Sequence, residues 1–204
     1  MDIVAVIDFE TTGLSPAQGD RATEIAAILF EKGQVVDRYQ SLMNAGVRIP
    51  AFIESLTGIT NSMIRSAPSA AQVMCEVASF VGDIPLVAHN ASFDSKFWDA
   101  ELALINQRRR QEFACSLLLA RRILPQAPSH KLGHLIQFAN LPQAGRAHRA
   151  LADAEMAASL LQHLEEQLCS RFKVSNVSHK LLRRIQSVPK AKLEQCMVQL
   201  QQRH

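Results

Sequence analysis

The sequence predicts an α/β protein in which helices cover a central β-sheet. Three apolar strand patterns follow one another within residues 3–42, and shorter strand patterns then alternate with helical patterns up to about residue 170. This alternation is typical of a sheet with helices packed on its faces. With 204 residues and 48% hydrophobic content, the chain is long enough for one domain with a short extension. We therefore expect one domain over residues 1–170 and a C-terminal helical hairpin extension over residues 171–204.

The first strand pattern is the stretch around which the chain is organised. Residues 3–7 are apolar and mostly β-branched, as in a strand buried inside a sheet. Asp8 and Glu10 follow at positions i and i+2, so on a strand both carboxylates point to the same face. Two anions held side by side need a cation between them, or a proton on one of them. Thr11 and Thr12 then place hydroxyl groups beside the pair.

This short pattern is weak when it is taken alone, because a solvated strand end with incidental acids would look the same. Two further Asp-x-Glu triplets occur, at residues 99–101 and 153–155. Both fall in helical patterns, where residues i and i+2 lie about 200° apart and cannot share one ion. The context of the first triplet is therefore what makes it a candidate site.

The remaining elements follow from hydrophobic periodicity and from turn residues. Residues 23–31 and 35–42 are the second and third strands, and Gly33 between them suits a hairpin. Periodicity of about 3.6 indicates the helices. The expected helices are 52–56, 69–81, about 91–106, 116–124, 130–139 and about 147–169, with a second short piece over 59–64. The expected short strands are 85–88 and 112–115.

Composition excludes several classes of protein. The net charge of +3 permits a polyanionic partner without demanding one. The four cysteines are far apart and form neither a zinc pattern nor a C-x-x-C motif, as in a protein of a reducing compartment. Acidic residues interrupt the N-terminal apolar run, and no apolar run approaches the length of about 18 residues that a membrane span needs. A soluble cytoplasmic protein without membrane contact is therefore predicted.

Two further carboxylates and a histidine fall where functional side chains gather in α/β sheets, at strand ends and in the loops beyond them. Asp94 lies just inside a helix that follows a strand, and Asp153 lies in the first turns of the long helix. His148 precedes Asp153 by five residues, which on a helix would place the two side chains about 140° apart. To share a site with Asp153, His148 must lie in the preceding loop or at the edge of the helix.

Together these residues predict a centre for two-metal phosphodiester hydrolysis. Four carboxylates, those of Asp8, Glu10, Asp94 and Asp153, cannot share a dry pocket without compensating charge. Two divalent cations about 3.5–4 Å apart would supply it. Oxygen ligands favour Mg2+ or Mn2+. His148 suits a general base, because an unperturbed histidine changes its charge near neutral pH.

Three motifs give these residues a specific resemblance. DFETTG at residues 8–13, HNASFD at 89–94 and HRALAD at 148–153 resemble, in order and spacing, the exonuclease motifs of the DEDDh group. That group belongs to the ribonuclease H-like (DnaQ-like) superfamily of 3′–5′ exonucleases. Residues 1–170 are similar to the proofreading epsilon subunit of bacterial DNA polymerase III. The resemblance implies a ribonuclease H-like, five-stranded mixed sheet with Asp8 on its central strand. It also implies cation ligation by Asp8, Glu10 and Asp153, support of a second ion by Asp94, and a general base at His148.

The resemblance further implies residues that hold the 3′-terminal nucleotide. The candidate substrate contacts are Thr11, Thr12, Leu14, Ile59, His89 and Asn90. In the family pattern the residues after the first Glu hold the nucleotide, Leu14 contacts the bases, and Ile59 wedges against the terminal base. An ordinary core position is the alternative for Leu14 and Ile59. Helix capping is the alternative for His89 and Asn90, and it is favoured for Asn90. Arg146 and Arg149 flank His148 and are candidate phosphate contacts.

These observations predict a metal-dependent 3′–5′ exonuclease that releases nucleoside 5′-monophosphates from single-stranded ends, with DNA favoured. An RNA-trimming exonuclease of the ribonuclease T or oligoribonuclease type is the first alternative. Such sites use aromatic stacking, for which Phe9, Phe52, Phe93 and Phe97 are near candidates. A non-catalytic nucleic-acid-binding adaptor is the second, and the intact set of five residues argues against it. The expected partners are a DNA or RNA 3′ end and, through the extension, a protein. The extension is expected to be dispensable for chemistry.

Overall fold

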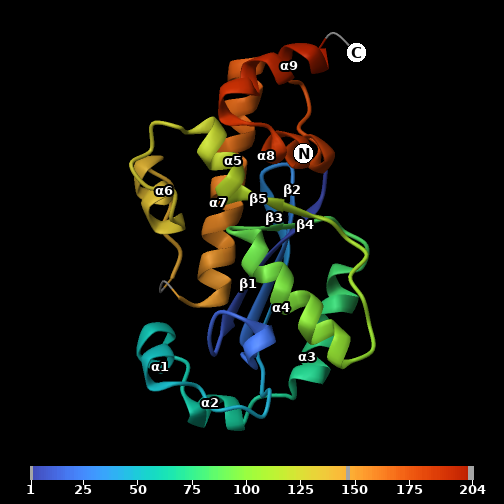
Figure 1. Cartoon of the computed structure of the whole chain (residues 1–204), viewed down its shortest axis with the longest axis vertical. Helices are drawn as coiled ribbons and strands as arrows, with labels where there is room; N and C mark the ends of the chain where they lie inside the picture. Colours follow the sequence, from blue (N-terminus) through green and yellow to red (C-terminus); the bar gives the residue numbers. More distant parts are fainter. Residues whose placement is uncertain (1, 146–147, 202–204) are drawn as a thin grey trace.

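The structure, a computed structural model, describes residues 2–145 and 148–201 and has three layers (Figure 1). The middle layer is a five-stranded sheet in the order β3-β2-β1-β4-β5. Its strands are β1 (Val4–Thr11), β2 (Ala22–Glu31), β3 (Gln34–Leu42), β4 (Leu86–Ala88) and β5 (Phe113–Cys115). The first three strands pair antiparallel, whereas β4 pairs parallel with both β1 and β5. The sheet is therefore mixed and β1 is its central strand, which confirms the expected fold.

Helices cover both faces of this sheet. The helices are α1 (Ala51–Thr57), α2 (Asn61–Arg65), α3 (Ala70–Val81), α4 (Ala91–Leu104), α5 (Ser116–Ile123), α6 (Leu132–Phe138), α7 (Ala150–Phe172), α8 (His179–Ser187) and α9 (Leu193–Gln201). Helices α3 and α4 pack on one face of the sheet in one hydrophobic core cluster. Helices α5, α6, α7, α8 and α9 form a second cluster with the other face. Figure 1 shows the long helix α7 running beside the sheet, with α1 and α2 at the end where α7 begins.

The sequence of β1 determines which side chains reach each layer. Ala5, Ile7 and Phe9 are buried against α3 and α4, whereas Val4 and Val6 are buried on the α7 side. Side chains alternate along a strand, so the even-numbered Asp8 and Glu10 also face the α7 side. Both carboxylates are only partly buried, because the strand end opens into the site described below.

Two helix starts differ from their expected form. The helix expected from about residue 147 begins at Ala150, and residue 147 itself lies outside the described residues. Asn90 precedes α4 as expected, but its backbone is left-handed (φ 69°) and its side chain makes no capping hydrogen bond. A capping side chain normally extends from an extended backbone, so the expectation that Asn90 caps α4 through its side chain is wrong.

The C-terminal region is helical, as expected, but it continues the main core. Five apolar side chains that follow α7 are buried in the cluster that α5, α6 and α7 form. They are Val177, Leu182, Ile185, Leu193 and Met197. The division of the chain at residue 170 and the dispensability of the extension for chemistry both stay predictions. The packing adds that truncation would expose an apolar face and destabilise the protein.

Helix α8 also closes the open edge of the sheet. The side-chain carbonyl of Gln186 accepts a hydrogen bond from the Cys115 N–H (2.6 Å), and its amide donates to the Phe113 carbonyl (3.4 Å). His179 Nε2 donates to the Leu86 carbonyl (2.9 Å). Covering an edge strand in this way satisfies backbone groups that would otherwise be free to pair with another chain.

All four cysteines carry free thiols. Within residues 2–145 and 148–201, no helix combines the length and the apolar composition that crossing a membrane requires.

Candidate active site

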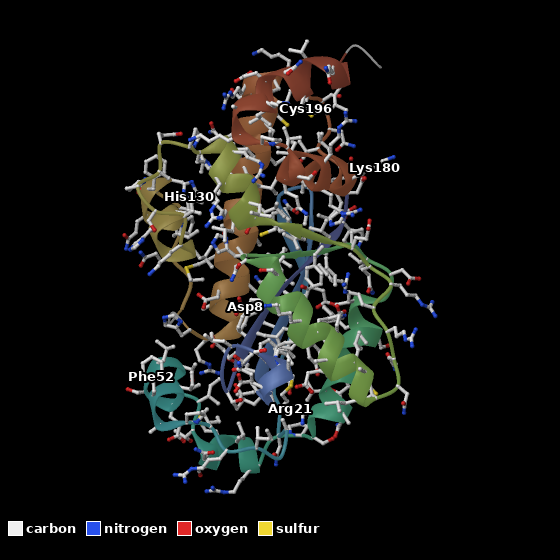
Figure 2. All side chains as sticks on the ribbon, in the orientation of Figure 1. Asp8, Arg21, Phe52, His130, Lys180 and Cys196 are labelled. Atoms are coloured by element: carbon white, nitrogen blue, oxygen red, sulfur yellow. The ribbon has the colours of Figure 1, made fainter. Side chains whose placement is uncertain are left out.

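The five side chains predicted to act together line one cavity of about 670 Å³ at the C-terminal end of β1. They are Asp8, Glu10, Asp94, His148 and Asp153. Figure 2 shows Asp8 at the end of the sheet that faces Phe52 on α1, while Lys180 and Cys196 of the C-terminal helices lie toward the opposite end. The fold therefore brings together three motifs that are separated by more than 50 residues along the chain and keeps the extension away from them.

Asp94 is held against β1 by a backbone hydrogen bond. It lies in the first turn of α4, is buried, and accepts a bond from the Phe9 N–H at Oδ1 (3.2 Å). Phe9 lies beyond Ala5 and Val6, the residues of β1 that pair with β4, so its N–H is not used by that strand. Because Phe9 separates Asp8 from Glu10, this bond places the second motif directly at the first.

His148 lies in the loop before α7, as the angular argument from the sequence required. Its backbone is left-handed (φ 61°), a conformation that costs a non-glycine residue about 1 kcal/mol. The His148 N–H donates to Asp153 Oδ2 (3.1 Å), and the Asp153 N–H donates to the Arg149 carbonyl (3.1 Å). These bonds hold the exposed imidazole at the mouth of the cavity. Ligand atoms of Glu10, His148 and Asp153 all lie within 4.8 Å of one another.

Burial and mutual repulsion disfavour the ionised form of every carboxylate in the cavity. Burial raises the pKa of Glu10 to about 8, and the charges of Asp153, Glu24 and Asp94 add to the shift. Burial raises the pKa of Asp94 to about 7, although the hydrogen bond from Phe9 opposes it. The pKa values of Asp8 and Asp153 are also raised, chiefly by burial. Four partly or fully buried carboxylates that share one cavity need positive charge nearby to ionise together.

Divalent cations fit this set of donors. The four side chains offer carboxylate oxygens, the ligands that hard cations prefer, and Glu10 and Asp153 converge closely enough to share one ion. Asp8, with its strongly raised pKa, faces the same cavity beside them. Asp94 lines the same cavity and its charge acts on Asp8, so its carboxylate is available to support a second cation. The chemistry of the donors is consistent with hydrolysis that depends on divalent metal.

Cation removal should make the stability of the protein fall with increasing pH. Between the ordinary value of 4.5 and the folded value of about 8 for Glu10, the unfolded chain releases a proton that the folded chain retains. The melting temperature in a chelator should therefore fall across this window more steeply for the wild type than for Glu10→Gln. Mg2+ or Mn2+ at a concentration of about a hundred times Kd should raise the melting temperature of the wild type by about 5–10 °C at pH 8. Parallel melting curves for the two proteins would contradict the raised pKa.

The turn after β1 forms one wall of the cavity. Thr11 and Thr12 are buried in it and line the cavity, but their hydroxyl groups already have partners. Thr11 Oγ1 donates to the Gly13 carbonyl (2.6 Å), and Thr12 Oγ1 accepts from the Arg21 N–H (3.0 Å). Leu14 projects from the same turn and is 79% exposed. Leu14 lines the cavity, so the core alternative for Leu14 does not hold, and its contact with the bases stays a prediction.

The wedge position expected for Ile59 is wrong in this structure. Ile59 is 0% exposed, packs with Ile49 and Ile64, and is absent from the described residues that line the cavity. Helix α1 lines the cavity instead, through Phe52 (73% exposed) and Leu56. The sequence pattern could not separate Ile59 from these two residues, because all three are apolar and Ile59 follows just after the end of α1.

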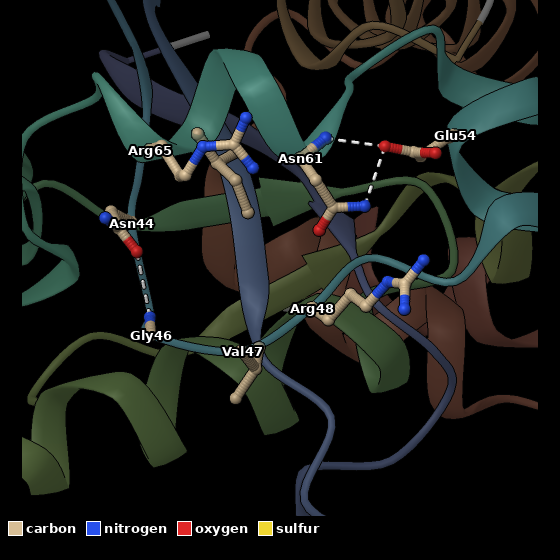
Figure 3. Close-up of a pocket in the computed structure, with 8 residues that line it drawn as sticks. Asn44, Gly46, Val47, Arg48, Glu54, Asn61 and Arg65 are labelled. Atoms are coloured by element: carbon tan, nitrogen blue, oxygen red, sulfur yellow. Dashed lines mark hydrogen bonds between the residues drawn. The ribbon is translucent and has the colours of Figure 1, made fainter.

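Helix α1 is held in place from its far side. There a second cavity, of about 540 Å³, is lined by polar side chains of the loop before α1 and of α2 (Figure 3). Glu54 accepts hydrogen bonds from the Asn61 backbone N–H (2.6 Å) and side-chain amide (2.7 Å), and Asn61 Oδ1 accepts from the Ile49 N–H (2.8 Å). These bonds fix the orientation in which α1 presents Phe52 to the active-site cavity.

His89 lines the cavity with both ring nitrogens already bonded inside the protein. Nε2 donates to the His130 carbonyl (3.0 Å), and Nδ1 lies 2.9 Å from Ser116 Oγ. Burial lowers the pKa of His89 to about 4, so the ring is neutral. A phosphate contact through a ring nitrogen is therefore excluded in this conformation. Asn90 is exposed, lines the cavity, and accepts a hydrogen bond at Oδ1 from Ser92 Oγ (3.3 Å).

One buried residue near the site was missed by the sequence reasoning. Glu24 of β2 is buried and forms a two-point ion pair with Arg149 (2.7 and 3.0 Å). The expectation that Arg149 contacts phosphate is corrected by this pair, while Arg146 lies outside the described residues. A single charged residue inside the apolar run 22–30 was the available signal, because a buried carboxylate requires a partner.

A family model described as "Exonuclease" matches residues 5–161, which is most of the chain. The chain belongs to the exonuclease family. "DNA polymerase III PolC-type" of Oceanobacillus iheyensis is 36% identical over 176 residues, covering 86% of this chain and 12% of that protein. "3′-5′ exonuclease DinG" of Bacillus subtilis is 37% identical over 164 residues, covering 80% and 18%. The chain thus spans less than a fifth of the length of these curated relatives.

Solved structures of exonucleases share the fold. Exonuclease X in complex with 5′ overhanging duplex DNA superposes with a TM-score of 0.72 at 25% identity, covering 90% of this chain and 99% of that one. The nuclease domain of 3′hExo, a DEDDh family member bound to rAMP, gives a TM-score of 0.71 at 21% identity, covering 82% and 94%. The exonuclease family and the ribonuclease H-like fold are therefore those that the three motifs predicted.

Proposed function

We propose that this chain is a metal-dependent 3′–5′ exonuclease that removes nucleoside 5′-monophosphates from single-stranded ends. The observation that carries the proposal is the convergence of the three motifs, with their four carboxylates and one histidine, on a single cavity. The printed activity of the relative DinG, 3′–5′ exonuclease, supports the same direction of hydrolysis. Metal dependence is a property of the family, and two ions of Mg2+ or Mn2+ are our proposal for this chain.

The side chains divide the work of hydrolysis between them. Asp8, Glu10 and Asp153 would hold one cation, and Asp8 with Asp94 the second. Bound cations offset the negative charge of the phosphodiester and make water a stronger nucleophile. His148, exposed at the mouth of the cavity, would accept the proton of the attacking water. The water oxygen forms a bond to phosphorus, the bond from phosphorus to the 3′ oxygen of the preceding nucleotide breaks, and that oxygen takes a proton from solvent.

The apolar walls suit the bases of an unpaired strand end. Leu14 and Phe52 both line the cavity and are exposed, and Leu56 and Phe93 add to its lining. Bases stack on aromatic rings without a strict sequence requirement. The gap between the turn after β1 and α1 would receive the terminal nucleotide, while the carboxylates lie below it around the scissile phosphate.

Removing the exposed ring of Phe52 should weaken substrate binding more than chemistry. One base–aromatic stack contributes about 1–3 kcal/mol, so Phe52→Ala should raise KM by about 5–100-fold. The single-turnover rate at saturating substrate should stay within about threefold of wild type. Phe138→Ala is the matched control, because Phe138 is another exposed phenylalanine (42%), on α6 and outside the cavity. Equal KM values for both variants would remove Phe52 from the substrate site.

The choice between DNA and RNA is tested directly. Single strands of matched sequence, labelled at the 5′ end, should shorten stepwise from the 3′ end in Mg2+ or Mn2+. Faster shortening of DNA would support the favoured reading. Faster shortening of RNA would favour an RNA-trimming enzyme, to which the phenylalanines Phe9, Phe52 and Phe93 in the cavity lend support. No shortening with retained nucleic-acid binding would instead indicate a non-catalytic adaptor. A cytoplasmic location and a protein partner of the C-terminal helices are further proposals.

A further inference from the structure

Two buried glutamates outside the cation site hold the two loops that carry its functional side chains. The first is Glu24, whose carboxylate accepts hydrogen bonds from Arg149 Nε (3.0 Å) and Nη2 (2.7 Å) and from the backbone N–H of Ala150 (3.0 Å). Gln40 donates a further bond to Glu24 Oε1 (2.8 Å). The carboxylate therefore fixes both the side chain and the backbone of the two residues that follow His148. We name this set the Glu24 clamp.

The second glutamate, Glu101 of α4, repeats the arrangement on the other side of the site. Its carboxylate accepts hydrogen bonds from Arg21 Nε (2.9 Å) and Nη2 (2.8 Å) and from the backbone N–H of the next residue, Ala22 (3.1 Å). Arg21 in turn pairs with Thr12 through both backbone groups, since the Thr12 N–H donates to the Arg21 carbonyl (2.9 Å) and the Arg21 N–H donates to Thr12 Oγ1 (3.0 Å). We name this set the Glu101 clamp.

We infer that the two clamps are positioning devices with separate tasks: the Glu24 clamp sets the loop of His148 and so the rate of hydrolysis, and the Glu101 clamp sets the turn that carries Thr12 and so substrate binding. The inference rests on the proposed function for the roles of His148 and of the turn after β1. Glu24 and Glu101 would touch neither substrate nor cation, so each is a positioning residue that acts through the groups it holds, an arginine side chain and the backbone N–H of the next residue.

The position of Glu24 in the sheet explains why it governs His148. Glu24 stands directly opposite Glu10 in the pairing of β2 with β1. The clamp therefore joins Ala150, the first residue of α7, to Glu24 of β2, which pairs with the proposed cation ligand Glu10. His148 has a left-handed backbone with Asp153 on one side and the clamped Arg149 on the other. Loss of the clamp would release the Arg149 side chain and the Ala150 N–H, and so remove a restraint that opposes return of His148 to an ordinary backbone conformation.

Arginine suits both positions better than lysine would. The planar guanidinium meets a carboxylate at two points and so sets direction as well as distance. Burial of both carboxylates, at 1% and 2% side-chain exposure, removes the competing water. Arg149 and Arg21 remain partly exposed, so each stays hydrated when its glutamate is neutralised. Glu24→Gln and Glu101→Gln therefore loosen the clamps with little change of volume.

The test measures single-turnover rate and KM on a labelled single strand in Mg2+ for the full chain. Glu24→Gln should lower the saturating rate by about 100-fold, the usual effect of misplacing a reacting group by about 1 Å, with KM within about twofold. Glu101→Gln should raise KM by about tenfold, the size of one lost charged hydrogen bond, with the rate within about threefold. Asp99→Asn is the control, because it breaks a two-point arginine pair with Arg109 on the surface of α4. Its rate and KM should equal those of the wild type.

Arg149→Lys and Arg21→Lys keep the positive charge but lose the two-point contact, and they replace a glutamine variant that fails to fold. Arg149→Lys should lower the rate, and Arg21→Lys should raise KM. The inference would be overturned if variants of both clamps changed the rate and KM to the same extent, or if their values matched those of Asp99→Asn. The two pairs would then have a purely structural role. The wild type separates this failure from that of the proposed function: an inactive wild type contradicts the function, whereas an active wild type with unaffected clamp variants contradicts the clamps alone. In a His148→Ala background, Glu24→Gln should cause no further loss of rate.

Discussion

Asp8→Ala should abolish hydrolysis while the protein keeps its fold. Asp8 lies in the C-terminal half of the central strand, faces the same layer as Glu10, and is close enough to Asp94, Asp153 and Glu10 for all three charges to raise its pKa. Loss of a cation removes several kcal/mol of transition-state stabilisation, so the rate should fall by more than about 10³-fold. Burial and repulsion raise the Asp8 pKa, and the alanine variant should therefore melt at a higher temperature than the wild type in a chelator at pH 8.

The measurement is release of nucleotides from a 3′-labelled strand, alongside a thermal melt and a titration of cation binding. Asp99→Ala is the matched control, because Asp99 begins another Asp-x-Glu triplet, on the helix α4, where the spacing cannot gather two carboxylates. The control should keep wild-type activity. Near-normal Mg2+-dependent activity in folded Asp8→Ala would refute the site.

His148→Ala should reduce the single-turnover rate by about 10²–10⁴-fold, the usual contribution of a positioned acid or base. A histidine accepts a proton only when it is neutral, so the wild-type rate should fall as the pH becomes acidic. The variant should lose this dependence. His134→Ala, which removes an exposed histidine of α6 outside the cavity, should change neither the rate nor its pH dependence.

Cation affinity decides between two roles of His148. Its ring lies within 4.8 Å of ligand atoms of Glu10 and Asp153, so the imidazole is also close enough to bind a cation. If His148 is the base, Mg2+ or Mn2+ affinity should survive the substitution while the rate falls. A loss of affinity that accounts for the whole loss of rate would make His148 a ligand, and unchanged single-turnover rates would remove it from the mechanism.

Within this site, local geometry was predictable wherever one element decided it. Alternation along a strand predicts that Asp8 and Glu10 share a face, and β1 confirms it. The 100° step of a helix predicts that His148 cannot lie on the same helix as Asp153 and still meet it, and α7 begins after His148. Both arguments need only the geometry of one segment, which is why they hold without knowledge of its neighbours.

Burial and hydrogen-bond partners depended on segments that are distant in sequence. Ile59 and Phe52 are both apolar and belong to neighbouring segments, yet one is fully buried and the other exposed at the cavity. Both ring nitrogens of His89 are bonded to distant segments, Nε2 to the His130 carbonyl 41 residues away and Nδ1 to the Ser116 hydroxyl 27 residues away, and burial keeps the ring neutral. Periodicity shows that a face is apolar, but it does not show which other segment covers that face.

The sequence by itself determined the fold class, the three motifs and the five residues that meet at the cavity, because these follow from periods of strands and helices and from the chemistry of carboxylates. Only the tertiary structure decided how the residues are held. Glu24 meets Arg149 across 125 residues and Phe9 meets Asp94 across 85. Such contacts form when the sheet and helices pack into one core, so their partners exist only in the folded chain.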